Sequence, residues 1–218
     1  MKKRLFILIV LILFADTVFA EVLRVVPDSP DITRNYLFYL HGRIVEGSDG
    51  RPISPDYGPY EYYKIVEAFS DEGFIVISEI RQKNTDPQSY SKKVEVSIAH
   101  LIGKDVPPKN ISIVGASKGG NIAARISSAL QEPDIKYVIL AGLFAGSESE
   151  RGFKLSGRVL SLHDSSDRFP ISPEDYFIKS PKLQAKKIII TNTGLGHGLL
   201  YKPHKVWFSE ALSWINLK

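Results

Sequence analysis

The stretch ISIVGASKGGNIAARI, Ile111–Ile126, leads from an apolar run directly into a glycine-rich turn and then into a helical pattern. Its first part is a continuous β-type run, and its last part repeats apolar residues at helical spacing. Between them, Gly115, Gly119 and Gly120 surround Ser117 with no polar linker. Because glycine has no Cβ, a strand and a helix can approach closely there, and Ser117 must adopt a strained backbone conformation. The stretch therefore predicts a sharp strand–turn–helix that holds the Ser117 hydroxyl above a sheet.

Similar apolar runs alternate with helical patterns along the rest of the chain. Continuous apolar runs are typical of strands that are covered on both faces. The runs are Asn35–Leu40, Phe74–Ser78, Ile111–Gly115, Tyr137–Gly142, Arg158–His163 and Lys187–Thr191, with Glu21–Val26 as a candidate edge strand. Helical spacing occurs over Tyr62–Phe69, Val94–Ile102, Ile122–Leu130 and Phe208–Ile215. The alternation predicts an α/β fold, a doubly wound and mainly parallel sheet with helices on both faces, and leaves the order of the strands open.

The composition limits the size of the fold and the class of partner. The chain has 218 residues, of which 44% are hydrophobic and 24% charged, as in one globular domain with its own core. The formal net charge is +4; Lys2, Lys3, Arg4 and Asp16 together contribute +2 of it, which leaves +2 for residues 21–218. Because this charge is small and no basic cluster remains, a nucleic-acid partner is not expected.

The first twenty residues, MKKRLFILIVLILFADTVFA, have the layout of a cleaved secretory signal. A basic start precedes the apolar run Leu5–Ala15, and small residues stand at Val18 and Ala20. The run is shorter than the ~20 apolar residues that span a bilayer, which disfavours the alternative of an uncleaved anchor. We expect cleavage after Ala20, a single domain over residues 21–218, a secreted or periplasmic protein, and no stable membrane span after cleavage.

Several kinds of site are excluded by residue types that the chain lacks. It contains no cysteine, which rules out disulfides, a thiol nucleophile and a cysteine-based zinc site. The glycines around Ser117 match neither G-x-x-x-x-G-K-[ST] nor G-x-G-x-x-G, so a nucleotide site is not expected. The sequence therefore predicts chemistry that uses neither a metal nor a cofactor.

A serine nucleophile needs a base and an orienting acid, and candidates follow two predicted strands. Asp167 lies in DSSDRFP, and His197 lies between glycines in NTGLGHGLL. Side chains at the carboxyl ends of parallel strands meet at the crevice where such folds bind ligands. Asp164 is a second candidate for the acid, and His204 and His163 are further candidates for the base.

The oxyanion of an acyl-transfer reaction needs hydrogen-bond donors, and two backbone N–H groups are candidates. The Lys118 N–H lies at the positive N-terminus of the predicted helix after Ser117. In FYLHGR, another predicted strand ends before His41 and Gly42, where a turn would offer the Arg43 N–H as the second donor. We expect His41 to shape this turn and not to act as a base.

The motifs LHGR, GASKGG, HDSSDRFP and GLGHG resemble, in order and separation, those of the α/β-hydrolase superfamily. The resemblance extends over nearly all of residues 21–218. It implies a triad of Ser117, Asp167 and His197, which follow one another in the superfamily's chain order. It also favours Asp167 over Asp164, because the family's acid typically precedes a short turn that contains proline.

The resemblance implies an exported serine hydrolase that cleaves a carboxylic ester or thioester through an acyl-enzyme. One alternative is a serine peptidase of the same fold, although such enzymes usually carry a cap for which this chain has no room. Another is a non-catalytic binding protein that retains the fold, although nothing structural would require all three triad residues. The expected substrate is a small-molecule or polymer-attached ester, and the sequence does not indicate an oligomeric state.

Two segments bear on how the substrate is held. The segment Leu143–Ser156 is too short for the helical lid of many relatives, so no substantial lid domain is expected. In the loop Glu46–Tyr60, Tyr57 and Tyr60 either form an amphipathic wall for the substrate or pack the loop onto the body. Arg81 follows a predicted strand and either meets an anionic substrate group or forms a surface ion pair.

Overall fold

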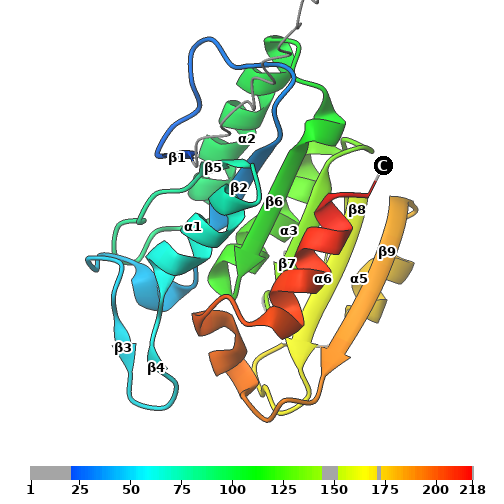
Figure 1. Ribbon diagram of the computed structural model, residues 1–218. Helices are drawn as coiled ribbons and strands as arrows, with labels where there is room; N and C mark the ends of the chain where they lie inside the picture. Colours follow the sequence, from blue (N-terminus) through cyan, green and yellow to red (C-terminus); the bar gives the residue numbers. More distant parts are fainter. Residues whose placement is uncertain (1–20, 144–151, 171–172, 218) are drawn as a thin grey trace, which may run out of the picture.

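The computed structural model of the chain describes residues 21–143, 152–170 and 173–217 (Figure 1). The predicted signal segment and its cleavage point after Ala20 lie outside these residues. Most of the segment judged too short for a lid also lies outside them. Both expectations therefore stay predictions.

A seven-stranded sheet forms the centre of the fold, with the strand order β1-β5-β2-β6-β7-β8-β9. Every neighbouring pair in it is parallel. Its strands are β1 (Glu21–Leu23), β2 (Tyr36–Leu40), β5 (Ile75–Ile77), β6 (Ile111–Ala116), β7 (Lys136–Leu140), β8 (Ser156–Asp164) and β9 (Lys182–Thr191). Each of the seven predicted strands is present, and the doubly wound α/β class is confirmed.

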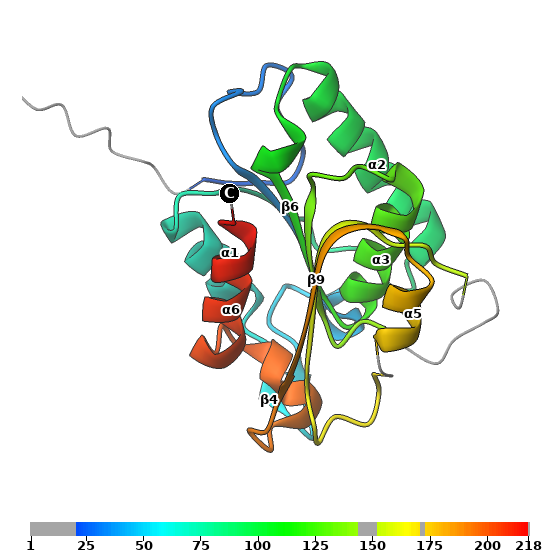
Figure 2. The same cartoon turned by 90° about the vertical axis from the view of Figure 1, so that its right-hand side faces the viewer.

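Helices cover both faces of the sheet (Figure 2). One face carries α1 (Tyr62–Asp71) and α6 (Lys205–Ile215), and the other carries α2 (Pro87–Gly103), α3 (Lys118–Leu130) and the short α5 (Glu174–Ile178). Side chains of β2 alternate between the two apolar clusters: Tyr36, Phe38 and Leu40 join one, and Leu37 and Tyr39 join the other. Because both faces are covered, the central strands β2, β6 and β7 are apolar at nearly every position, with Ser112 and Lys136 as the exceptions.

The remaining elements are short and lie in the loops. They are the hairpin strands β3 (Ile53–Ser54) and β4 (Gly58–Pro59), and the 3-10 turns η1 (Arg43–Val45), η2 (Pro108–Asn110) and η3 (Gly196–Tyr201). None of them was predicted, because short turns and two-residue strands show neither the continuous apolar run of a buried strand nor a helical period.

The loops that follow β2, β6, β8 and β9 gather at one edge of the sheet, because parallel strands all end on the same side. This edge is the lower end of the sheet in Figure 1. The four loops carry Arg43, Ser117, Asp167 and His197, respectively. The topology therefore collects the predicted site residues from four distant parts of the chain.

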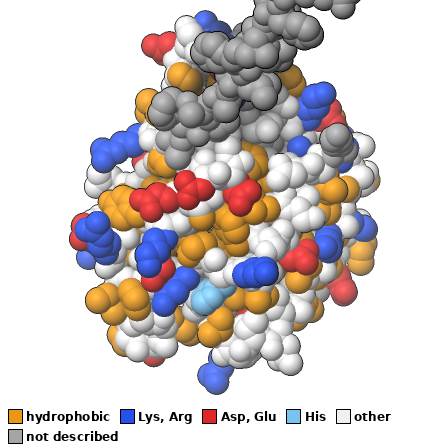
Figure 3. Space-filling view, viewed as in Figure 1, with side chains coloured by type: hydrophobic (Ala, Val, Ile, Leu, Met, Phe, Trp, Pro, Cys, Tyr) orange, Lys and Arg blue, Asp and Glu red, His pale blue; other side chains and the backbone are white. Residues whose placement is uncertain are grey.

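The surface gives two further observations. Across residues 21–143, 152–170 and 173–217, no helix is long and apolar enough to cross a membrane. On the face shown in Figure 3, basic and acidic side chains are interspersed with hydrophobic ones. The described side chains on this face therefore form no continuous basic surface of the kind that binds nucleic acid.

Candidate active site

Ser117 forms the turn between β6 and α3 in a strained backbone conformation. Its φ is 53° and its ψ is −119°, a combination that residues other than glycine rarely adopt. Its N–H donates to the Leu140 carbonyl oxygen at 2.8 Å, and its carbonyl oxygen accepts from the N–H of Gly120 at 2.8 Å. Such a conformation costs ~1–3 kcal/mol and persists only where the surroundings fix it. The strain that the glycine-rich turn predicts is therefore present at the serine.

The glycines on either side of Ser117 have no room for a side chain. A Cβ on Gly115 would lie 2.3 Å from the Gly119 carbonyl oxygen, and a Cβ on Gly119 would lie 1.8 Å from the Leu40 carbonyl oxygen. A Cβ on Gly120 would lie 2.8 Å from the Cα of Gly142. These residues thus let α3 approach the ends of β2, β6 and β7, as the sequence predicts for Gly115 and Gly119.

The Ser117 hydroxyl meets His197 and Asp167, which lie on two other loops. Ser117 Oγ lies 2.9 Å from His197 Nε2, and His197 Nδ1 lies 2.7 Å from Asp167 Oδ2. The other oxygen of Asp167 accepts from the Phe169 N–H at 3.0 Å. The side chains of His197 and Asp167 are 12% and 1% exposed. His197 therefore lies within hydrogen-bond reach of both Ser117 and Asp167, with the acid shielded and the imidazole edge accessible.

A second turn lies beside the serine at the end of β2. A Cβ on Gly42 would lie 3.6 Å from the Cβ of Ser117, and η1 begins at the next residue, Arg43. Within the described part of the chain, the N–H groups of Arg43 and Lys118 donate to no other backbone group. Both residues line the same cavity as Ser117. Two backbone donors are thus available next to the serine hydroxyl.

His41 holds this second turn and is fully buried. The Arg81 N–H donates to His41 Nε2 at 3.0 Å, which places the imidazole proton on Nδ1, 2.8 Å from the Gly42 carbonyl oxygen. Burial, and after it the nearby Arg81 guanidinium, lowers the pKa of His41 to about 3. His41 is therefore neutral and positions the turn before Arg43, as the sequence predicts.

Solved structures identify the architecture. No protein-family model and no curated protein matches the sequence. Arabidopsis thaliana SOBER1 is 17% identical; the match covers 82% of this chain and 99% of SOBER1, with a TM-score of 0.51. A lipase-esterase related protein from Clostridium acetobutylicum is 15% identical; the match covers 84% of this chain and 96% of that protein, with a TM-score of 0.55. The Pyrococcus furiosus esterase Pf2001 is 14% identical; the match covers 85% of this chain and 86% of that protein, with a TM-score of 0.55. The chain has the α/β-hydrolase fold. Structural similarity at such low sequence identity establishes the fold alone. The activity must be argued from the residues of the site.

Asp164, the alternative acid, has a different position in this α/β-hydrolase fold. It ends β8, is 1% exposed, and forms none of the hydrogen bonds of the His197 imidazole found among the described residues. Its carboxylate accepts hydrogen bonds from Ser166, Thr191 and Thr193, which contribute two N–H and three O–H donors at 2.5–3.0 Å. Burial raises the pKa of Asp164, but these hydrogen bonds outweigh that effect and hold the pKa below its ordinary value. Asp164 therefore ties together the loops that follow β8 and β9.

The other candidate bases lie outside the site. His204 occupies the N-cap position of α6. His163 lies in β8, and burial lowers its pKa. Neither lines the cavity that contains Ser117. Of the three histidines weighed from the sequence, the structure brings only His197 to the serine.

Arg81 does not reach the cavity, in contrast to one expectation from the sequence. It is 2% exposed, and its Nε lies 3.2 Å from Glu46 Oε1. Its terminal NH2 donates to the His41 carbonyl oxygen at 2.5 Å. The Lys118 ammonium pairs with the same carboxylate, 2.7 Å from Glu46 Oε1. Arg81 thus forms a buried ion pair, neither a substrate contact nor a surface pair, because its guanidinium is held by Glu46 and by the His41 carbonyl oxygen.

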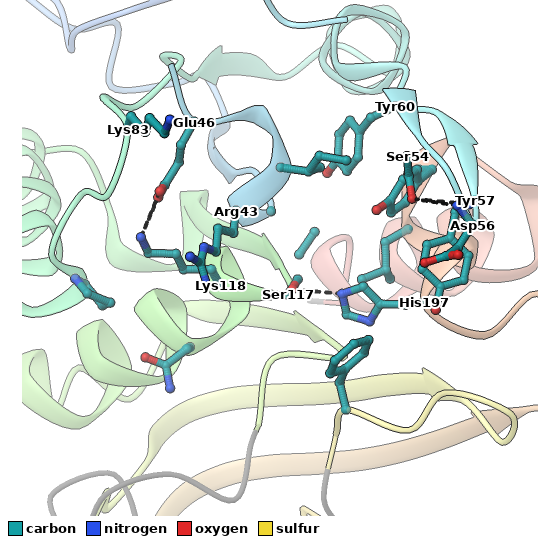
Figure 4. A pocket seen from close by; sticks show the side chains of 18 of the residues that line it. Arg43, Glu46, Ser54, Asp56, Tyr57, Tyr60, Lys83, Ser117, Lys118 and His197 are labelled. Carbon is teal, nitrogen blue, oxygen red and sulfur yellow. Dashed lines mark hydrogen bonds and ion pairs between the residues drawn. The ribbon is translucent and has the colours of Figure 1, made fainter. Parts of the chain in front are cut away.

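A cavity of about 970 Å³ opens over Ser117 (Figure 4). Its lining comes mainly from the segments that follow β2, β5, β6, β8 and β9: Gly42, Arg43, Ile44, Glu46, Ser54, Asp56, Tyr57, Tyr60, Lys83, Asn84, Pro87, Ala116, Ser117, Lys118, Asn121, Phe169, His197, Leu200 and Tyr201. Tyr60 is buried, its hydroxyl lies 2.7 Å from that of Tyr39, and burial raises its pKa to about 12. The Tyr57 ring lies 5.4 Å from that of Tyr201. Tyr57 and Tyr60 therefore both pack the loop and line the cavity.

Sequence reasoning missed some residues of the cavity. Phe169 is 58% exposed, and its ring centroid lies 4.9 Å from that of His197. Its signal was its place two residues after Asp167, because the loop that presents the acid must also present its neighbours. Lys83 and Glu46 carried no comparable signal. Among the described residues, no group of three or more His, Asp or Glu side chains is arranged to hold a metal ion.

Proposed function

We propose that the protein is a serine hydrolase that cleaves carboxylic esters or thioesters. One observation carries the proposal: strained Ser117 lies 2.9 Å from His197 Nε2, while Asp167 lies 2.7 Å from Nδ1 of the same imidazole. A fold requires no such chain of contacts at the mouth of a cavity, whereas acyl transfer requires each of its members. The alternative of a non-catalytic binding protein has no comparable observation in its favour.

In the proposed first step, Ser117 Oγ attacks the substrate carbonyl carbon and His197 Nε2 takes the hydroxyl proton. Asp167 holds the imidazole so that Nε2 is free to accept, and it stabilises the imidazolium that forms. The N–H groups of Arg43 and Lys118 donate to the oxyanion. His197 then returns the proton to the leaving oxygen or sulfur, which departs and leaves an acyl-enzyme on Ser117.

In the second step, His197 takes a proton from water as the water oxygen attacks the acyl carbon. Collapse of this second tetrahedral intermediate releases the acid and returns the proton to Ser117 Oγ. A cavity of about 970 Å³ is at the upper end of the size range of small-molecule sites. This volume supports a small ester, or the esterified end of a larger molecule, as substrate.

We further propose that residues 1–20 direct export and are removed after Ala20. The basic start and the short apolar run support this proposal. N-terminal sequencing of the protein recovered outside the cytoplasm should begin at Glu21, and a start at Met1 would contradict it.

The function is tested by a fluorophosphonate probe, which reacts only with an activated serine. Residues 21–218 should be labelled, Ser117→Ala should not be labelled, and ester hydrolysis should fall by a factor of about 10⁶ in that variant. Labelling should also fall sharply in His197→Ala and Asp167→Asn. Circular dichroism confirms that each variant is folded. A folded parent that neither reacts with the probe nor hydrolyses 4-nitrophenyl esters would contradict the proposal.

A further inference from the structure

The cavity over Ser117 has two chemically different sides. In Figure 4, Arg43, Lys118, Glu46 and Lys83 lie together on one side of Ser117. His197 and the aromatic rings of Tyr57 and Tyr60 lie on the other, with Asp56. The first group is called the cationic side below and the second the aromatic side. Any substrate that reaches the serine must place its parts against both.

The cationic side holds more positive than negative charge. Its one carboxylate, Glu46, has a side chain that is only 2% exposed and is already shared by Arg81 and Lys118. Arg43 and Lys83 are exposed, line the cavity, and form no ion pair with any of the described residues. On this side, one carboxylate thus stands against three cations that line the cavity. Charges held in a partly enclosed cavity with one excess sign attract a ligand of the opposite sign.

The buried part of this network occupies the one carboxylate of the cationic side. Nη1 of Arg81 is buried without a hydrogen-bond partner among the described residues. The Glu46 oxygens accept from Arg81 Nε and from the Lys118 ammonium, so this carboxylate has little capacity left for Arg43 or Lys83. The protein therefore supplies no counter-charge for the two exposed cations, and an anion from solution would do so.

The direction of the reaction assigns the two sides to the two halves of an ester. His197 must return its proton to the leaving oxygen, so the alcohol part lies against His197. The rings of Phe169 and Tyr57 have centroids 4.9 and 6.3 Å from that of His197 and offer an apolar surface there. The acyl part then extends toward Arg43 and Lys83, away from the imidazole.

We propose that the substrate is an ester whose acyl part ends in an anionic group, such as the monoester of a short dicarboxylic acid, and whose alcohol part is apolar or aromatic. This inference rests on the proposed function, since it uses Ser117 and His197 in their catalytic roles. Arg43 and Lys83 bind the anionic end, and Tyr57 and Phe169 contact the alcohol. Substrate specificity then follows from charge on one side and from apolar contact on the other.

The test compares two 4-nitrophenyl esters of the same shape, the hemisuccinate and the 4-methylpentanoate, whose acyl chains differ by a carboxylate against an isopropyl group. Rates are corrected with Ser117→Ala, because the hemisuccinate can hydrolyse by itself. The ratio of their kcat/KM values should favour the hemisuccinate about tenfold or more, and added salt should lower it. Lys83→Gln should reduce the ratio several-fold, Lys83→Arg should preserve it, and Lys104→Gln on the far end of α2 should leave it unchanged.

The outcomes separate the two proposals. If the neutral ester is hydrolysed and the ratio is near or below one, the anionic specificity is wrong while the hydrolase function stands. A high ratio that is equal in the parent and in Lys83→Gln would also overturn the assignment of the cationic side. If neither ester is hydrolysed and the fluorophosphonate probe does not react, the hydrolase function itself fails.

Discussion

Two buried carboxylates lie on either side of Ser117, and each ties loops of the site together by different means. Asp164, on the side of His197, accepts five hydrogen bonds from neutral N–H and O–H groups. Glu46, on the side of Arg43, pairs with the cations Arg81 and Lys118. Asp164 is thus stabilised by the N–H and O–H dipoles of the segments around the ends of β8 and β9. Glu46 is stabilised by the full charges of two side chains that are distant in the sequence.

This difference determines how each side of the site responds to the loss of its carboxylate. Removing a carboxylate from neutral donors leaves those donors unsatisfied, and hydroxyl groups can partly reorient. Removing a carboxylate from a buried cation leaves a full charge with no counter-charge, which costs more free energy. The same contrast holds for function, because only the Glu46 side leaves cations available to a ligand.

The largest effect is expected for Glu46→Gln. The Arg81 side chain is 0% exposed and would lose its counter-charge, so the free energy of unfolding should fall by about 3–5 kcal/mol. The turn before Arg43 should loosen as well, since Arg81 holds it by donating its N–H to His41 Nε2 and its Nη2 to the His41 carbonyl oxygen. Urea denaturation measures the first effect, and the rate of fluorophosphonate labelling measures the second.

The control for this prediction is the double variant Glu46→Gln/Arg81→Met. Replacing a buried pair by neutral groups is often far less costly than breaking it. Stability should therefore recover in part relative to Glu46→Gln alone. A double variant that is less stable than the single variant would show that Arg81 contributes by packing and not as a counter-charge.

A smaller effect is expected for Asp164→Asn. The amide of asparagine would face the N–H of Thr193, a donor that cannot reorient, and the free energy of unfolding should fall by about 2 kcal/mol. Labelling of Ser117 should also slow, because the loop that carries His197 begins at this contact.

The matched control is Asp167→Asn, which changes the carboxylate that contacts His197. Labelling should fall more in this variant than in Asp164→Asn, while the loss of stability should be smaller. The assignment of the two aspartates would be reversed if Asp164→Asn kept full stability and lost the most labelling.

Much of the fold could be predicted from the sequence, because every strand of the sheet contains an apolar run. The edge strand β9 shows the limit of this signal. It begins at Lys182, five residues before the predicted start, since KLQAK is polar and largely exposed at the edge of the sheet. The start of α2 was also placed too late, although Asp86 and Pro87 carry its capping signal. The strand order and α5 had no signal in the sequence.

The candidate site also contains residues that the sequence predicts and contacts that it does not. Ser117, Asp167 and His197 lie in short motifs at strand ends, so their local sequence marks them. The contacts of Glu46 with Arg81 and Lys118 join residues that are 35 and 72 positions apart. No periodicity or motif encodes contacts of this kind, because they depend on which loops the sheet brings together.

His41→Gln is expected to change the free energy of unfolding least near neutral pH. The pH dependence of this change distinguishes the Arg43 side of the site from the His197 side. The pKa of His41 is lowered from its ordinary 6.5 to about 3, chiefly by burial. Between these values the unfolded chain binds a proton that the folded protein does not, so acid destabilises the native state there by ~1.4 kcal/mol per pH unit. In His41→Gln this part of the pH dependence should be absent, and the stability difference from the parent should shrink and then reverse its sign as pH falls from 6.5 to 4.5. The pKa of Asp164 is lowered from 3.8, since its hydrogen bonds outweigh its burial, and its stabilisation is lost only as pH falls below that value. The difference between Asp164→Asn and the parent should therefore stay constant over the same range. Urea denaturation at several pH values measures both, and parallel curves for the parent and His41→Gln would show that His41 can be protonated in the folded protein.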